Sequence, residues 1–467
     1  MPLLFPLFLL LPGHSPAVTD MEAGAATPAP VALAAQDALS VLRSTGLSGL
    51  DAFEFLGKIL ACGPRLAGSD NAARAVVVTR SIMETLGLEN VHVEEVTVTL
   101  WERGHTDVRI VGLDSGDIGL AAAALGGSIG TPGDGITAEV VQVMSLDEAR
   151  SLGEKGRGRI VFFNRPMPPD VLDTFDAYGK SADQRAHGAA AAAASGATAV
   201  LVRSMTLRTS DLPHTGIMQY DEGVPPIPAA GLSTAAADRL AALLQERGTV
   251  RVHMELGCRT VGPVKTHNVV GDVRGREKPD EIVVVGGHLD SWDLGPGAHD
   301  DGAGCAQSLE ALRLIKALPV APRRTVRAVM FMDEESGGTG GKAYVADPLR
   351  KTETHVAAIE SDRGGFLPLG FTVLADEPAL QAFNRWLPAL SHLGVTFIRK
   401  GYGGVDIHPL STTGCITIGL YPDSQRYFDV HHCAADTLDT VNERELELGA
   451  IQMAGLAWLL AEEGVPR

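Results

Sequence analysis

The fold is decided by residues 281–304, which read EIVVVGGHLDSWDLGPGAHDDGAG. Residues 282–285 form a short apolar run of the length expected for a buried strand, and a helix is predicted over residues 302–317. The loop between them is polar and carries His288 and Asp300. An apolar strand that leads through a polar loop into a helix is typical of a parallel α/β sheet with helices on both faces.

The same pattern repeats towards the C-terminus. Strands are predicted at 325–332 and 355–359, a helix near 340–347, and a last helix over 443–462. The sequence therefore predicts an α/β fold, in which a mostly parallel sheet is sandwiched by helices. In such sheets ligands bind beyond the carboxyl ends of the strands, so polar residues at those ends are candidates for a functional site.

The middle of the chain has a different sequence pattern. From about residue 107 to 261 it consists of short β-like runs with an Ala-rich helix, which predicts a β-rich unit inserted into the α/β domain of residues 45–106 and 262–467. At the N-terminus, an apolar run followed by small residues predicts a signal peptide over residues 1–20. An Ala- and Pro-rich linker is expected over residues 21–44.

Composition and charge narrow the function. The 57 acidic residues exceed the 39 basic ones, giving a formal net charge of −18, so the chain should repel nucleic acid and anionic lipid. The N-terminal apolar run is too short to span a bilayer, so stable membrane insertion is not expected. The predicted signal peptide indicates a secreted or periplasmic protein. Five widely spaced cysteines without a CxxC indicate neither a disulfide framework nor a zinc ribbon.

Candidate ligands follow each predicted strand. His288 and Asp290 follow the first strand, Glu334-Glu335 the second, and Asp362 the third, while Asp300 precedes the first helix. Singly, each is more often a solvated surface group than a ligand. Together they lie on one edge of one sheet, and imidazoles and carboxylates without clustered thiolates suit catalytic zinc, or else manganese or cobalt.

These residue types also suggest roles. One carboxylate could bridge two metal ions, as binuclear hydrolases require. Asp290 is two residues after His288 on an extended segment, so its carboxylate should accept the N–H of the imidazole. Of the adjacent Glu334 and Glu335, one can bind metal while the other takes a proton from water. Five nearby residues are interpreted as loop groups or as supports of the ligands: Asp293, His299, Asp301, His408 and His431.

These motifs resemble the carboxypeptidase Q branch of the family-28 zinc peptidases, from about residue 45 to the C-terminus. The residues that carry the resemblance are 288–293 (HLDSWD), Asp300-Asp301-Gly302, Glu334-Glu335, Glu360-Ser361-Asp362, and His431-His432 before Asp436-Thr437. The resemblance implies that Asp300 bridges two zinc ions, completed by His288 and Asp362 at one and by Glu335 and His432 at the other. It also implies that Glu334 is the catalytic base. The choice of His432 over His431 rests on the resemblance alone.

The resemblance implies further features. The inserted unit would be a protease-associated domain, the Asp300–Asp301 peptide bond would be cis, and the chain would form a homodimer. The expected activity is hydrolysis of dipeptides or short peptides with free termini, by a dipeptidase or carboxypeptidase, or alternatively by an aminopeptidase. Two other interpretations are a glutaminyl cyclase-like cyclotransferase with one zinc and a catalytically inactive binding domain. The intact ligand set and the insertion count against the cyclotransferase, and the presence of every matched ligand counts against the inactive binding domain.

Overall fold

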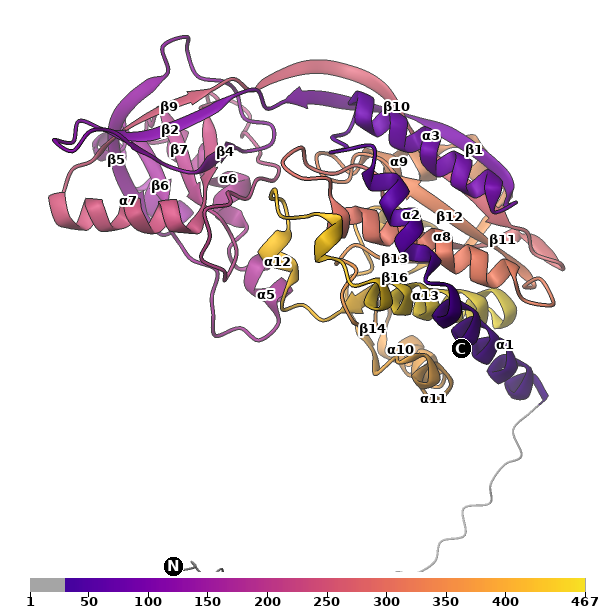
Figure 1. The fold of residues 1–467 in the computed structure, drawn as a ribbon. Coiled ribbons are helices and arrows are strands. Elements are labelled where there is room, and N and C mark those ends of the chain that lie inside the picture. The colour runs from indigo at the N-terminus through magenta and orange to yellow at the C-terminus, as the bar shows by residue number, and fades with distance from the viewer. Residues whose placement is uncertain (1–29, 467) are drawn as a thin grey trace, which may run out of the picture.

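The computed structural model describes residues 30–466, which form two lobes joined by two long strands (Figure 1). The main lobe is built on an eight-stranded sheet. In order across the sheet, its strands are β1 (Glu89–Glu102), β10 (Arg259–Val273), β12 (Arg324–Phe331), β11 (Lys278–His288), β13 (Thr354–Glu360), β16 (Ile416–Pro422), β14 (Pro368–Val373) and β15 (Phe397–Lys400). Its helices are α1 (Pro30–Gly49), α2 (Asp51–Leu60), α3 (Asp70–Thr85), α8 (Ala303–Lys316), α9 (Thr339–Ala346), α10 (Glu377–Asn384), α11 (Leu387–Leu390), α12 (Tyr427–Val430) and α13 (Glu443–Glu463).

The four central strands, β12, β11, β13 and β16, are parallel. Alternate residues of β11 enter two different cores: Val283 and Val285 pack with α8 and α13, whereas Ile282 and Val284 pack on the opposite face with Tyr344 of α9. A strand buried on both faces explains why residues 282–285 are apolar without alternation. The expected α/β fold is confirmed, with antiparallel strands added at both edges of the parallel centre.

The register of the central strands brings the candidate ligands to one edge. His288, the last residue of β11, pairs with Phe331 at the end of β12, and Gly286 pairs with Glu360 at the end of β13. The ends of β11 and β12 are therefore level, and β13 ends two residues earlier in the register. The loops that leave them carry the carboxylates singled out by sequence, as the rule for parallel sheets predicts.

The second lobe holds another eight-stranded sheet. Its strands, in order, are β3 (Ile118–Gly119), β2 (Thr106–Val111), β9 (Arg251–Leu256), β5 (Ile136–Val143), β6 (Ile160–Phe163), β7 (Ala199–Arg203), β8 (Ala229–Leu232) and β4 (Ala122–Ala124). Four helices belong to it: α4 (Leu146–Arg150), α5 (Thr174–Gly179), α6 (Asp183–Ala193) and α7 (Thr234–Arg247). The antiparallel pair β1–β10 carries the chain out to this lobe and back.

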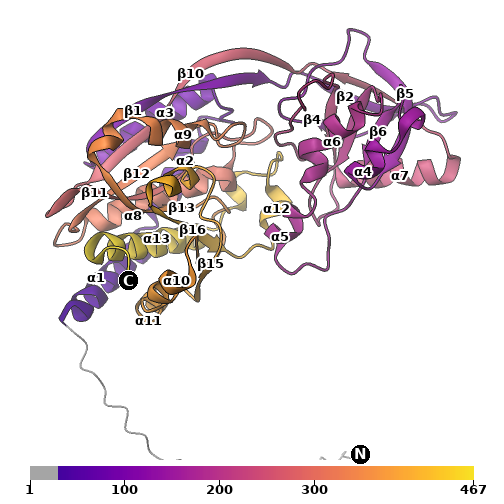
Figure 2. The ribbon, with the colours of Figure 1, turned by 180° about the vertical axis from the view of Figure 1, so that it is seen from behind.

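The lobes touch directly beyond that pair of strands. Both views place α5 of the inserted lobe against α12 of the main lobe (Figures 1 and 2). Phe175 of α5 lies 5.3 Å from the ring of Tyr427 and 5.2 Å from that of Phe428. The Thr174 backbone N–H donates to Ser424 Oγ at 3.3 Å. This contact lies next to the loop that carries His431 and His432.

The N-terminal part differs from expectation. Residues 30–44, expected to be linker, belong to helix α1, whose Pro30 suits the first turn of a helix. Leu39 and Leu42 are 2% and 0% exposed in the main core, so burial of this apolar face stabilises a helix where composition had suggested a linker. The predicted signal peptide lies outside the described residues. Within residues 30–466, no helix is long and apolar enough to cross a membrane.

Candidate metal centre

The five predicted metal ligands meet where the central strands end. His288 closes β11, Asp300 lies in the segment before α8, and Glu335 follows β12. Asp362 stands two residues after β13, and His432 lies in the loop after α12. Residues separated by up to 144 positions in the sequence are thus brought into one cluster, at the strand ends where the sequence placed the candidate ligands.

Asp300 stands between two imidazoles. Its Oδ1 lies 3.2 Å from Nε2 of His288, which is 3.3 Å from Asp362 Oδ1. Its Oδ2 lies 3.1 Å from Nε2 of His432, which is 2.9 Å from Glu335 Oε2. Each imidazole therefore faces one oxygen of Asp300 and one further carboxylate, so the donors form two groups that share Asp300.

Several of these donor atoms lack hydrogen bonds although they are buried. His288 Nε2, Asp300 Oδ2 and Glu335 Oε1 make none within the described part of the chain, and the three residues are 0%, 5% and 5% exposed. Buried polar atoms nearly always have a hydrogen-bond partner, so three unpaired polar atoms in one cluster need an explanation. Carboxylate and imidazole atoms aimed at a common point fit divalent metal ions, and zinc among them.

Charge supports the same conclusion. Burial raises the pKa of Glu335 to about 7, and the nearby Asp300 carboxylate adds to the shift. Burial also raises the pKa of Glu334 well above its usual value, with Asp362 and Glu335 acting in the same direction. Burial acts to lower the pKa of His432, but Glu335 and Asp300 outweigh it and raise the pKa to about 10. The carboxylate groups of this site outnumber the positively charged groups that the protein places beside them. A bound cation would lower the pKa values of these carboxylates and so favour their ionised form.

His431 and Asp301 are the rivals for ligation. His431 Nε2 lies 3.6 Å from Asp300 Oδ2, farther than His432, and its ring stacks on that of His432 with centroids 3.5 Å apart. Asp301 also lies within reach of His288 and Asp362, but its two oxygens each accept a backbone N–H, of His288 at 3.0 Å and of Gly304 at 2.9 Å. The geometry thus favours His432 and Asp300 over their neighbours in the chain.

Asp290 occupies a different position from the one expected. Its carboxylate is 3.7 Å from Nδ1 of His288, and Nδ1 instead lies 3.0 Å from the backbone carbonyl of Asp290. The carboxylate accepts three successive backbone N–H groups, of Asp333 at 2.7 Å, Glu334 at 3.2 Å and Glu335 at 3.3 Å. The expected contact is therefore wrong: the loop after β12 exposes three N–H donors beside Asp290, and they compete successfully for its oxygens.

Two further residues hold the loops, a role that was not predicted from the sequence. Asp436 accepts the backbone N–H of His299 at 2.7 Å and of Asp300 at 3.0 Å. Arg65 is 0% exposed and donates to backbone carbonyls of the loop after β11, including Leu289 O at 2.7 Å. For Asp436 there was a signal in the sequence, because it lies four residues after His432 in a motif that carries the family resemblance; for Arg65 there was none. The Asp300–Asp301 peptide bond is cis, as predicted.

The other residues interpreted as loop or support groups lie around this cluster. Asp293 pairs with Arg103 of the segment after β1. His299 stacks on Phe366 at 4.0 Å, and its Nδ1 accepts the backbone N–H of Gly365 at 3.1 Å. His408 is exposed and belongs to none of the groups that could hold a metal among the described residues.

Two hollows adjoin the cluster. A small one is lined by Asp300, Glu335, His432 and Trp292. A larger one, about 240 Å³, also has Trp292 in its wall, together with Leu66, Trp101 and Ile217. Its polar wall is made by Thr97, Thr99 and Thr260 of β1 and β10, and by Asp333, Ser336 and Thr339 between the end of β12 and the start of α9. Trp292 thus separates the metal centre from a hollow that has both an apolar and a polar wall.

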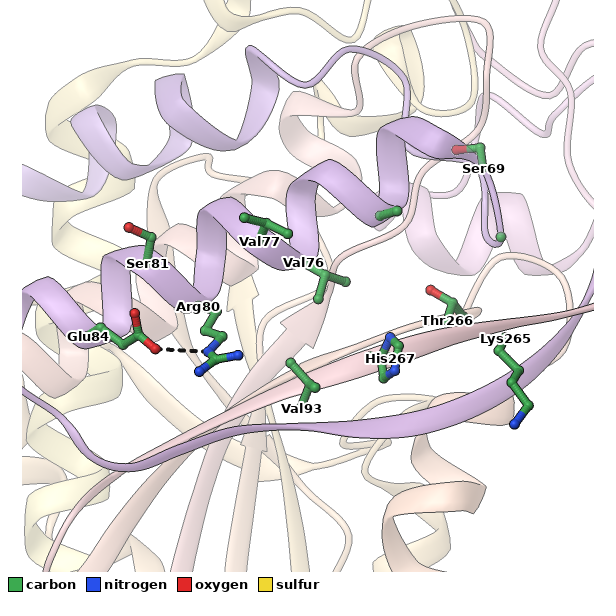
Figure 3. A pocket seen from close by; sticks show the side chains of 12 residues that line it. Ser69, Val76, Val77, Arg80, Ser81, Glu84, Val93, Lys265, Thr266 and His267 are labelled. Atoms are coloured by element: carbon green, nitrogen blue, oxygen red, sulfur yellow. Dashed lines mark hydrogen bonds and ion pairs between the residues drawn. The ribbon is translucent and has the colours of Figure 1, made fainter.

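A more spacious cavity lies elsewhere. It measures about 660 Å³ and is bounded by α3 and by strands β1 and β10, with Val76, Val93 and His267 in its wall (Figure 3). The Arg80–Glu84 ion pair, 2.8 Å long, closes one end. None of its lining residues belongs to a group that could hold a metal among those described. We therefore assign it no role in the reaction.

All five cysteines are buried and unpaired, which agrees with the absence of a predicted disulfide framework. Cys433 follows His432, but its Sγ points to a backbone carbonyl, that of Val430 at 3.2 Å. It is a buried neighbour of the metal centre.

Comparison with known proteins agrees with this geometry. The family model described as Peptidase family M28 matches residues 268–456, the segment that contains all five candidate ligands. Carboxypeptidase Q of Mus musculus is 35% identical over 418 residues, which cover 89% of this chain and 87% of the relative. Carboxypeptidase Q of Homo sapiens is 35% identical over 407 residues, covering 87% and 84%.

Solved structures are similar as well. A peptidase M28 precursor from Shewanella amazonensis SB2B has a TM-score of 0.88 at 34% identity, covering 93% of this chain and 98% of that one. BSAP, a zinc aminopeptidase from Bacillus subtilis, shares the fold with a TM-score of 0.64 at 20% identity, covering 87% and 93%. Together with the clustered carboxylates and imidazoles, these matches show that the chain belongs to peptidase family M28, as a carboxypeptidase Q-like metallopeptidase.

Proposed function

We propose that this chain is a binuclear zinc exopeptidase that hydrolyses dipeptides or short peptides with free termini. The observation that carries the proposal is the position of Asp300, whose two carboxylate oxygens face two different imidazoles. In this proposal His288 and Asp362 complete one metal position, Glu335 and His432 complete the other, and Asp300 bridges them. Manganese or cobalt would suit the same donors.

Two metal ions at these positions would lower the pKa of a water molecule and polarise the scissile carbonyl. Glu334 is the proposed base, because it is partly exposed at the centre and its backbone N–H is held by Asp290 at 3.2 Å. Its carboxylate takes a proton from the attacking water and passes it to the nitrogen of the leaving amine. Water adds to the carbonyl carbon, the C–N bond breaks, and the products are a carboxylic acid and an amine.

The hollow of about 240 Å³ supports a preference for substrates with an apolar side chain. Leu66, Trp101, Ile217 and Trp292 supply apolar walls, and Asp333, which precedes the proposed base in the chain, also lines the hollow. Small-molecule sites are concave and mostly apolar, with a few polar groups that orient the ligand. An aminopeptidase remains the second candidate, supported by the fold that the chain shares with BSAP.

A cyclotransferase and an inactive binding domain are less well supported. A cyclotransferase with one zinc has no use for the second group of donors, formed by Glu335 and His432. A catalytically inactive binding domain would not need unpaired, buried carboxylate and imidazole atoms aimed at one another. We also propose that the inserted lobe is a protease-associated domain, that the protein is exported, and that it forms a homodimer. N-terminal sequencing of the mature protein and light scattering test the last two.

The proposed function is tested by counting metal ions in the purified protein by mass spectrometry and by assaying a dipeptide panel before and after chelation. We expect close to two zinc ions per chain and cleavage that is lost with the metal and restored with zinc. A terminally blocked peptide series should be cleaved poorly. A metal-free protein that cleaves nothing after zinc is restored would contradict the proposal.

A further inference from the structure

We infer that the inserted lobe completes the metal centre, with Thr215-Gly216 holding the imidazole of His432 so that Nε2 faces Asp300 and Glu335. This inference rests on the proposed function, since it concerns a proposed metal ligand. It gives the inserted lobe a direct part in metal binding and makes the two metal positions unequal.

Thr215 contacts His432 through both of its backbone polar groups. Its N–H donates to the carbonyl of His432 at 2.9 Å, and its own carbonyl lies 3.2 Å from Nδ1 of His432. An imidazole that binds metal through Nε2 carries its proton on Nδ1, so Nδ1–H donates to this carbonyl. Such outer contacts fix the orientation of a ligating histidine.

Arg185 of α6 is the other neighbour of that nitrogen. Its Nη1 lies 3.4 Å from Nδ1 of His432. A guanidinium group has only donors and cannot accept the Nδ1 proton. The Thr215 carbonyl is therefore the acceptor, and Arg185 limits the space into which the imidazole could turn.

Gly216 is required by the close approach of the two lobes. Its φ is +132°, and a Cβ at this position would lie 2.7 Å from Nδ1 of His432 and 2.6 Å from Cζ of Arg185. Both distances are shorter than any ordinary contact, so a side chain would displace the imidazole or the guanidinium. His432 itself has φ +60°, a conformation that a residue other than glycine keeps only where its surroundings hold it.

The segment that holds His432 is itself anchored. Thr215 is 1% exposed; its Oγ1 donates to Ala124 O at 3.0 Å and lies 3.1 Å from Nη1 of Arg103. The carbonyl of Gly216 accepts the backbone N–H of Gly126 at 2.9 Å. Because these partners belong to the inserted lobe or its connecting segment, the position of His432 depends on where that lobe sits.

The other metal position has no such dependence. Nδ1 of His288 lies 3.0 Å from the carbonyl of Asp290, within the same loop of the main lobe. A change in the Thr215-Gly216 segment should therefore weaken the metal held by Glu335 and His432, and should leave the metal held by His288 and Asp362 in place.

The test is Gly216→Ala, with the dissociation constants of both zinc ions measured by competition with a chromophoric chelator. We expect one of the two constants, that of the position held by Glu335 and His432, to rise by about 10–100-fold, the usual effect of losing an outer partner of a ligand, and the other to stay unchanged. Gly223→Ala is the matched control, since Gly223 also has a positive φ, +79°, and a Cβ added there would meet no atom within 4 Å. It should leave both constants at their wild-type values.

Two more variants keep the inference falsifiable. Thr215→Val removes only the anchoring hydroxyl, so it should raise the dissociation constant of the same zinc ion, but by less than Gly216→Ala does. If Gly216→Ala does not fold, the result for Thr215→Val tests the inference in its place. In a His432→Ala background, Gly216→Ala should add no further loss, because both changes act on one ligand. Unchanged constants in folded Gly216→Ala, or equal loss of both metals, would overturn the inference. A wild-type protein that binds no zinc would instead contradict the proposed function.

Discussion

Glu334 and Glu335 are adjacent in the chain, yet their carboxyl groups have different surroundings. Glu335 is 5% exposed and lies 2.9 Å from Nε2 of His432, whereas Glu334 is partly exposed. Asp290 accepts the backbone N–H of both residues and so fixes the direction in which each leaves the strand. In the proposed mechanism Glu335 therefore binds metal, and Glu334 meets a water molecule at the surface of the centre.

We predict that Glu334→Gln lowers kcat by about 10²–10⁴-fold, because the amide cannot accept the proton of the attacking water. Both zinc ions should remain, since Glu334 is not one of the proposed ligands. Steady-state kinetics and metal analysis of the same preparation check this. Glu222→Gln, at an exposed position of the inserted lobe, serves as the control and should have wild-type activity. Turnover near wild type in Glu334→Gln would remove Glu334 from the proposed mechanism.

At the scale of residues, the sequence predicted what depends on strand ends and missed what depends on contacts between loops. His288, Glu335 and Asp362 could be found because parallel strands end at a common edge. His432 lies in an irregular loop, so neither periodicity nor spacing distinguishes it from His431. Asp290 shows the same limit: spacing gave the correct neighbour, His288, but could not reveal three competing N–H donors in another loop.

Helices α8 and α13 bury a pair of carboxyl groups where they pack under the main sheet. Glu310 of α8 and Glu447 of α13 are both 0% exposed. Arg313 pairs with Glu310 at 2.6 Å, while Glu447 Oε2 accepts the backbone N–H of Ala52 at 3.2 Å. Burial raises the pKa of Glu447 to about 8, and the neighbouring Glu310 carboxylate adds to the shift.

This pKa predicts how stability depends on pH. Between its ordinary value of 4.5 and about 8, Glu447 binds a proton in the folded state but not in the unfolded state. Stability is therefore greatest below pH 4.5 as far as this group is concerned, and its contribution is lost as the pH rises to 8, by up to about 1.4 kcal/mol per pH unit. Glu447→Gln should remove this part of the decline.

Urea unfolding at fixed zinc concentration from pH 5 to pH 8 measures the effect. As the pH rises, the unfolding free energy of wild type should fall relative to that of Glu447→Gln. Glu443→Gln, an exposed position on the same helix, should give a difference that does not change with pH. Parallel curves for Glu447→Gln and wild type would show that Glu447 is ionised throughout the range.

Among the elements, those with strong periodicity were predicted to within a few residues. The helix expected over 302–317 is α8, Ala303–Lys316, and the last helix, expected over 443–462, is α13, Glu443–Glu463. Helix α1 was missed because its Ala- and Pro-rich composition resembles that of a linker. Its stability comes from packing against the rest of the main core, which includes α13, and not from local sequence.

At the scale of the whole molecule, the inserted lobe and the main lobe jointly enclose the proposed site. Arg103 beside the inserted lobe pairs with Asp293 of the loop after β11, and its guanidinium lies 5.0 Å from the ring of Trp101. An insertion could be predicted from the change in sequence pattern along the chain. The sequence could not predict which of the inserted residues would meet the metal centre, because Thr215 and Ile217 lie in a segment without regular structure and more than 70 positions from His288.

The hollow of about 240 Å³ depends on both lobes, which makes its effect on substrate choice testable. Ile217→Trp would fill the hollow from the inserted lobe. A substrate with a bulky apolar side chain should then no longer fit, whereas a substrate with a methyl side chain should still fit. We expect kcat/KM for Leu-Ala or Ala-Leu to fall about 10–200-fold relative to Ala-Ala, the range that differences in apolar contact usually produce.

Ile129→Trp is the matched control for this change, since Ile129 is 37% exposed on the same lobe and does not line the hollow. It should leave the ratio of kcat/KM values between the leucine dipeptides and Ala-Ala unchanged. If Ile217→Trp folds, keeps two zinc ions and loses activity equally on all three dipeptides, the hollow does not receive a substrate side chain. The specificity would then come from another surface, while the assignment of the metal centre would stand, because that assignment depends on Asp300 and its two imidazoles and not on the hollow.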